Sequence, residues 1–116
     1  MRVVKALVRR KKDWIKFPTP EEMDDTAWRM FDRSGIRDIF AGIDGVHIRF
    51  QKHPRGIPPA QEVQDYWCRK QFYSINAMIV ANDRYIYSVD CGLFGSAHDA
   101  RVWNRSDAKI MMAVAT

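Results

Sequence analysis

The sequence predicts a small α/β domain, in which one helix precedes three strands and another helix follows them. Apolar residues recur at helical spacing within residues 20–33, whereas residues 43–50, 72–81 and 84–90 are rich in aliphatic and aromatic residues with extended patterning. A chain of 116 residues can bury one modest core. These observations together favour a single mixed domain.

The first helix has clear start and stop signals. Thr19 is a suitable N-cap, Pro20 suits the first helical position, and Glu22 can complete a capping box with Thr19. Gly35 stands where a C-terminal stop would fall. One helical face collects the apolar residues Met23, Ala27, Met30 and Phe31. We therefore expect an amphipathic helix over residues 20–33.

The first strand contains an acidic residue on its apolar face. In AGIDGVHIRF, residues 41–50, alternation places Asp44 on the same face as Val46, Ile48 and Phe50. The segment QKHPRGIPPAQEVQD that follows, residues 51–65, is rich in proline and glycine and predicts an irregular loop.

The next two strands predict a hairpin. Only Asn82 and Asp83 separate residues 72–81 from residues 84–90, so a tight turn is expected. After the hairpin, CGLFGS predicts a glycine-containing loop, and a helix is expected to begin near His98 with Ser96 as its cap.

The positive charge is concentrated at the N-terminus. The formal net charge is +5, and six of the 19 basic residues lie within residues 1–12, which contain no acid. The run Arg9, Arg10, Lys11 and Lys12 suits a polyanion or a nuclear import receptor, so these four residues are candidate nucleic-acid ligands. A solvated, frayed terminus without a role explains the same run equally well.

Composition excludes several classes of protein. Hydrophobic residues make up 47% of the chain and aromatic residues 12%, which argues against disorder. There is no apolar run of about 18 residues and no secretory h-region. Cys68 and Cys91 match no zinc spacing. We expect an intracellular protein, with the nucleus favoured by the basic run and the cytoplasm as the alternative, and no membrane partner.

Asp44 is the strongest candidate for chemistry, and two interpretations remain open. A carboxylate within Ile43-Asp44-Gly45-Val46 would be costly to bury without donors, a basic partner or a metal ion. Asp-Gly is also a common turn dipeptide, so Asp44 and Gly45 could simply begin the strand.

Three motifs in order resemble the DDE domain of PIF/Harbinger-type transposases and the Harbinger transposase-derived nuclease. They are residues 43–48 (IDGVHI), residues 70–76 (KQFYSIN) and residues 95–102 (GSAHDARV). Val46 departs from the usual Thr or Ser, and Gln71 departs from the usual Gly. The resemblance extends to WIKFPTPEEM and covers about residues 14–107.

The resemblance implies an RNase H-like mixed sheet with flanking helices, truncated after three strands and the following helix. It divides the chain into a basic tail (residues 1–18), a helical lead-in (19–40) and an incomplete nuclease domain (41–116). Asp44 would lie on the central first strand, where it would be catalytic and bind Mg²⁺ or Mn²⁺. The two ions of such a site would activate water or a DNA 3′-hydroxyl for attack on a DNA phosphodiester. Asp99 is a second candidate metal ligand, although a place near a helix N-terminus is favoured for it.

The second Asp and the Glu of the family's triad are expected downstream of the GSAHD motif, and this sequence contains neither. Enzymatic activity is therefore left open. One possibility is a metal-dependent nuclease domain with DNA as its partner. The other is a non-catalytic remnant that binds DNA or a protein, including a DNA-binding protein. An unpaired edge on the first strand is expected to favour oligomers.

Overall fold

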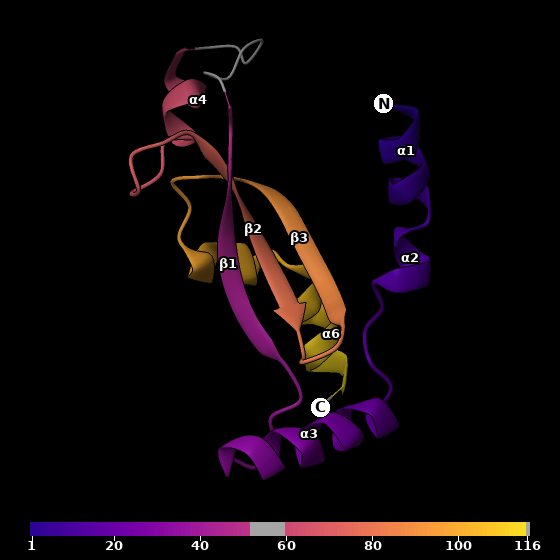
Figure 1. Ribbon diagram of the computed structural model, residues 1–116. Coiled ribbons are helices and arrows are strands. Elements are labelled where there is room, and N and C mark those ends of the chain that lie inside the picture. The colour runs from indigo at the N-terminus through magenta and orange to yellow at the C-terminus, as the bar shows by residue number, and fades with distance from the viewer. Residues whose placement is uncertain (52–59, 116) are drawn as a thin grey trace. The chain divides into compact units, whose positions relative to one another are not determined.

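The computed structural model of the protein describes residues 1–51 and 60–115. Its sheet consists of β1 (Gly42–Arg49), β2 (Ser74–Ala81) and β3 (Ile86–Phe94), with β2 between the other two (Figure 1). The strands are antiparallel, so the predicted α/β class and three-stranded sheet are confirmed. Within the described sheet β1 is an edge strand, as expected from the sequence, rather than the central strand that the resemblance implied.

Six helices accompany the sheet in the described part of the chain. They are α1 (Arg2–Arg9), α2 (Lys11–Trp14), α3 (Pro20–Ser34), α4 (Ala60–Asp65), α5 (Asp99–Asn104) and α6 (Asp107–Ala115). None of these helices is long and apolar enough to cross a bilayer. The chain forms two compact units, of which one contains Met1–Ile43 with Val80–Val89 and the other Asp44–Ile79 with Asp90–Thr116.

The start of α3 follows the local signals in the sequence. The Glu22 backbone N–H donates to Thr19 Oγ1 at 3.3 Å, and the Thr19 N–H donates to the Glu22 carboxylate at 2.8 Å. Pro20 occupies the first helical position, and Gly35 ends the helix in the left-handed region at φ 72°. The capping box and the glycine stop satisfy backbone groups that the helix itself leaves unpaired.

In the first unit, α3 is joined to the β2–β3 turn by polar contacts. The Arg29 guanidinium donates to Asp83 Oδ1 at 3.1 Å. Thr26, which is buried, accepts a hydrogen bond from the Asn82 amide at 3.0 Å, and the same amide contacts the Tyr87 hydroxyl at 2.5 Å. Asn82 Oδ1 accepts from the Arg84 N–H at 2.8 Å. The turn is therefore held to α3 by an ion pair beside a buried hydrogen-bonded cluster.

The ion pair between Arg29 and Asp83 should make the first unit sensitive to acid. Hydrogen bonding to Arg29 and the positive charges of Arg29 and Arg33 hold the pKa of Asp83 below its usual value. A carboxyl with a lowered folded-state pKa stabilises the fold above its unfolded pKa of about 3.9, and this contribution is lost as the pH falls through the folded value. We expect Asp83→Asn to lower the thermal midpoint at pH 7 but to have a shrinking effect below about pH 4.

Thermal melts followed by circular dichroism from pH 7 down to pH 2.5 would measure this difference. Asp32→Asn is the matched control, because Asp32 is an exposed residue on α3, the helix that carries Arg29. A difference between wild type and Asp83→Asn that stayed constant through the acid range would contradict the role of the Asp83 charge.

Several predicted boundaries were wrong. Residues 1–18 contain α1 and α2 instead of a frayed tail. Residues 60–65, predicted as loop, form α4, because Ala, Gln and Glu are good helix formers; residues 52–59 of that loop lie outside the described part. The hairpin turn spans residues 82–85, and β3 continues through residues 91–94, which were predicted as loop. Gly92 has φ 125° within this part of the strand, a backbone conformation that residues with a side chain rarely adopt.

In the second unit, α5 and α6 follow β3 and are separated by Arg105 and Ser106. Ser106 Oγ accepts from the Lys109 N–H at 3.1 Å and so caps α6. Val102 and Ala108 are buried and belong to the core. The predicted cap Ser96 was wrong, because His98 is the residue that precedes α5 and no side chain caps the helix.

Candidate active site at the first strand

Asp44 lies inside β1 and is exposed. The strand begins at Gly42, so Asp44 is not the turn residue that the Asp-Gly dipeptide suggested. Its Oδ1 atom lies 2.9 Å from the backbone N–H of Gly45. Val46 and Ile48, which share its face of the strand, are 44% and 51% exposed. The carboxylate therefore meets solvent, and the cost of burying it does not arise.

The other face of β1 is in close contact with Asp99, the first residue of α5. A Cβ atom built on Gly45 would lie 2.2 Å from Asp99 Oδ1 and 2.7 Å from its carboxyl carbon. These distances are far shorter than van der Waals contacts, so a larger residue at position 45 would require the Asp99 carboxylate to move. Since adjacent residues of a strand point to opposite faces, Asp99 packs on the side of β1 away from the Asp44 side chain.

Asn76 of β2 holds the segment that carries Asp99. Its Nδ2 atom donates to the Ala97 carbonyl at 2.9 Å and to Asp99 Oδ1 at 3.3 Å. Asn76 is 1% exposed, and its Oδ1 atom is buried without a hydrogen-bond partner in the described structure. Leaving a buried acceptor unpaired costs about 1–3 kcal/mol, so the two donated bonds must offset a real penalty.

Ser74, the first residue of β2, contacts His47 and Tyr66 and lies close to Gly95. Its Oγ atom lies 3.0 Å from Nδ1 of His47, and its backbone N–H donates to the Tyr66 carbonyl at 2.8 Å. A Cβ atom on Gly95 would lie 2.4 Å from Ser74 Oγ and 2.6 Å from the carbonyl oxygens of Ser74 and Tyr66. Gly95 is thus required for the backbone to pass this point.

The three sequence motifs therefore meet in one joint. The first supplies Gly45 and His47, the second Ser74 and Asn76, and the third contributes Gly95 and Asp99. Ser74, Asn76 and Gly95 were not among the predicted site residues. Their places in the motifs were the available signal, but spacing alone does not reveal which atoms meet. We call this cluster the motif joint; it fixes the backbone next to Asp44.

Asp90, an acidic residue of β3, does not combine with Asp44 and Asp99 into a metal site among the described residues. Asp90 accepts a hydrogen bond at Oδ1 from the Asp107 N–H at 3.2 Å, at the start of α6. Among residues 1–51 and 60–115 there is no group of three or more His, Cys, Asp or Glu side chains placed to hold a metal ion. The described residues therefore do not by themselves form the carboxylate set that a two-metal centre needs. Metal ligation by Asp44 and Asp99 stays a prediction.

The basic run is exposed and helical. Arg9 ends α1, Lys11 and Lys12 lie in α2, and Arg10 connects the two helices. The Arg10 Nε atom pairs with Asp13 at 3.1 Å. The structure thus presents these cations to solvent, and DNA contact by them stays a prediction.

Comparison with protein families identifies the class of the chain. The family described as DDE superfamily endonuclease matches residues 43–114, which is more than half of the sequence. The match begins one residue before Asp44 and contains the whole motif joint. The chain belongs to the DDE superfamily endonuclease family. Comparisons with curated proteins and with solved structures gave no match.

Proposed function

We propose that the chain is a Harbinger-type, transposase-derived nuclease domain in which Asp44 supplies one carboxylate of a divalent-metal site acting on DNA phosphodiesters. The observation that carries the proposal is the exposed Asp44 carboxylate, which stands beside the motif joint in the matched region. A hard ion such as Mg²⁺ or Mn²⁺ prefers oxygen ligands of this kind. We propose the nucleus as its compartment, since the substrate is DNA and the chain carries the basic run of residues 9–12.

A single carboxylate limits what the described part can do. DDE chemistry uses clustered carboxylates to hold the ions that activate a nucleophile and stabilise the leaving oxygen. Since the described residues hold no such cluster, we propose that Asp44 binds the ion weakly and that cleavage requires further acids near it. Those acids would have to approach the Asp44 face of β1, because the opposite face is packed against Asp99.

Weak metal binding at Asp44 can be measured without any catalysis. We expect Mn²⁺ to broaden the amide signals of residues near Asp44 in a ¹⁵N–¹H spectrum, with Gly45 among the most affected. Asp44→Asn should abolish this local broadening, because it removes the charge while keeping the size of the side chain. Asp32→Asn is the control and should leave it unchanged. Broadening that persists in Asp44→Asn would place the ion elsewhere.

Cleavage is a separate test of the same proposal. We expect this chain alone not to nick supercoiled plasmid with Mg²⁺ or Mn²⁺, because the described residues do not form a metal cluster. Nicking that appears and then disappears in Asp44→Ala would show that the described acids suffice. Asp90 and Asp99 would then be the residues to replace next.

A second candidate function is non-catalytic binding of a polyanion, and the exposure of Arg9, Lys11 and Lys12 favours it. We expect weak, sequence-independent DNA binding, with a log–log salt slope of roughly −0.9 for each phosphate neutralised. Deleting residues 1–12 should remove the binding and the nuclear signal. If the shortened chain keeps both, the binding surface lies elsewhere. Fluorescence anisotropy across salt concentrations and imaging of a tagged chain would measure the two effects.

A further inference from the structure

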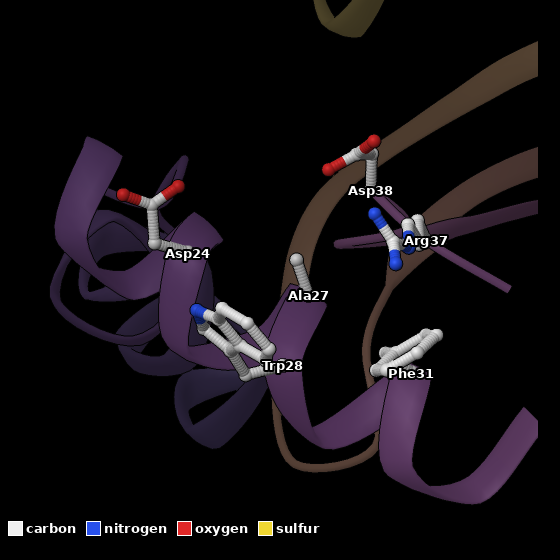
Figure 2. Close-up of a pocket in the computed structure, with 6 residues that line it drawn as sticks. All are labelled: Asp24, Ala27, Trp28, Phe31, Arg37 and Asp38. Atoms are coloured by element: carbon white, nitrogen blue, oxygen red, sulfur yellow. The ribbon is translucent and has the colours of Figure 1, made fainter. Parts of the chain in front are cut away.

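A pocket of about 290 Å³ lies on the first unit, between α3 and the residues that follow it. It is lined by Asp24, Ala27, Trp28, Phe31, Arg37 and Asp38. Figure 2 shows the two carboxylates along the upper side of the view and the two aromatic rings along the lower side. The pocket thus combines negative charge with aromatic surface.

The aromatic rings form a corner. The centroids of Trp28 and Phe31 are 6.4 Å apart, and their planes are inclined at 80°. Trp28 is 72% exposed, although a large aromatic side chain loses favourable burial by remaining in water. Two nearly perpendicular aromatic walls beside carboxylates are the arrangement that recognises methylated ammonium groups and guanidinium groups.

One wall of the corner already holds a cation from the chain itself. The Arg37 guanidinium carbon lies 5.5 Å from the centroid of the Phe31 ring. Figure 2 shows Arg37 above Phe31 and away from Trp28. Within the part of the chain that the structure describes, no cation lies over the Trp28 ring in the same way. Asp24 lies one helical turn before Trp28 on α3. Arg37 therefore shows what kind of group this surface accepts.

The carboxylates of the pocket are not committed to other cations. Asp24 and Asp38 form no ion pair with any residue in the described ranges. Both are exposed, so an incoming charge can reach each of them from solvent. With Arg37 included, the charged lining is two carboxylates against one guanidinium, which leaves one negative charge for a ligand.

We propose that this corner binds the cationic side chain of a basic peptide segment, a methylated lysine or an arginine, between Trp28 and the carboxylates of Asp24 and Asp38. Arg37 acts as an internal competitor that occupies the Phe31 wall and repels a second cation. The site shares no residue with the proposed metal site and does not depend on nuclease activity.

Titration of the ¹⁵N-labelled chain tests the proposal with three small probes. They are acetyl-trimethyllysine amide, acetyl-arginine amide and the uncharged acetyl-norleucine amide. The signal to follow is the Trp28 indole N–H, assigned by its loss in Trp28→Phe. We expect at least one cationic probe to shift this signal and the norleucine probe not to. The difference between the two cationic probes shows which head group the corner prefers.

Two substitutions should act in opposite directions. Asp24→Asn should weaken binding of the cationic probe by about two- to five-fold, since it removes one attractive charge. Arg37→Gln should strengthen binding of the same probe by a similar factor, because the substitution removes the competing cation. Asp32→Asn, on the same helix but outside the pocket, should change nothing. An equal shift with norleucine, or an Arg37→Gln variant that binds no better than wild type, overturns the proposal. Unchanged thermal midpoints in the variants would show that their folds are intact.

Discussion

Adding one methyl group at Gly95 should destabilise the protein by about 3 kcal/mol. The added Cβ atom would lie 2.4 Å from Ser74 Oγ and 2.6 Å from the Ser74 and Tyr66 carbonyl oxygens. The Ser74 side chain can rotate away, but the two carbonyl oxygens belong to backbone that is fixed by the bond from the Ser74 N–H to the Tyr66 oxygen. Relief therefore requires a shift of the backbone at the start of β2.

Urea unfolding of Gly95→Ala, followed by circular dichroism, would measure the loss. Gly42→Ala is a matched control, because its Cβ would make one ordinary contact, at 3.9 Å to the Ala81 oxygen. Replacing Ser74 by alanine in the Gly95→Ala background should restore little of the lost stability, since the contacts with the two backbone carbonyl oxygens remain. Full recovery in that double variant would show that the hydroxyl, and not the backbone, sets the restriction.

Local chemistry explains which parts of the fold the sequence could predict. The capping box of Thr19 and Glu22 and the glycine stop at Gly35 act within a few residues, so they determine the ends of α3 without help from the rest of the chain. The succession of strands along the chain and the presence of a hairpin after residue 81 follow from local patterning in the same way, although the turn is two residues longer than predicted. The ion pair of Arg29 with Asp83 joins residues far apart in the chain, and no spacing rule indicates it.

The surroundings of Asp44 show the limit of periodicity. Alternation correctly places Asp44, Val46 and Ile48 on one face of β1, because successive side chains of a strand point to opposite sides. It does not show which face is covered. The structure exposes the face that carries these side chains, whereas Gly45 contacts Asp99 on the other. Periodicity alone therefore leaves open whether this face is buried, and the structure shows Val46 and Ile48 about half-exposed on an edge strand.

The sequence indicates the three motifs that make up the motif joint, but it does not indicate how their residues contact one another. Asn76 and Asp99 come from segments whose order resembles the family, and Asp99 was expected near a helix N-terminus, where α5 indeed begins. That the Asp99 carboxylate is wedged against Gly45 is a property of tertiary packing. The consequence is that a Cβ atom at position 45 would meet the Asp99 carboxylate in its present position.

A paired substitution at Gly45 and Asp99 tests this close approach directly. Gly45→Ala should cost about 2 kcal/mol, less than Gly95→Ala, because the atoms it meets belong to one side-chain carboxylate that can move in part. Asp99→Ser should cost about 1 kcal/mol, since it removes a charge near the start of α5 while Asn76 keeps its bond to the Ala97 carbonyl. In the double variant the shorter serine leaves room for the new methyl group. Its total loss should therefore fall well below the sum of the two single losses.

The double-mutant cycle measures this coupling from urea midpoints of the four proteins, provided that the unfolding slopes agree. Gly42→Ala combined with Asp99→Ser is the control pair, and its losses should add, because Gly42 faces the Ala81 oxygen and not Asp99. Additive losses in the Gly45 and Asp99 pair would mean that the two residues do not share a contact.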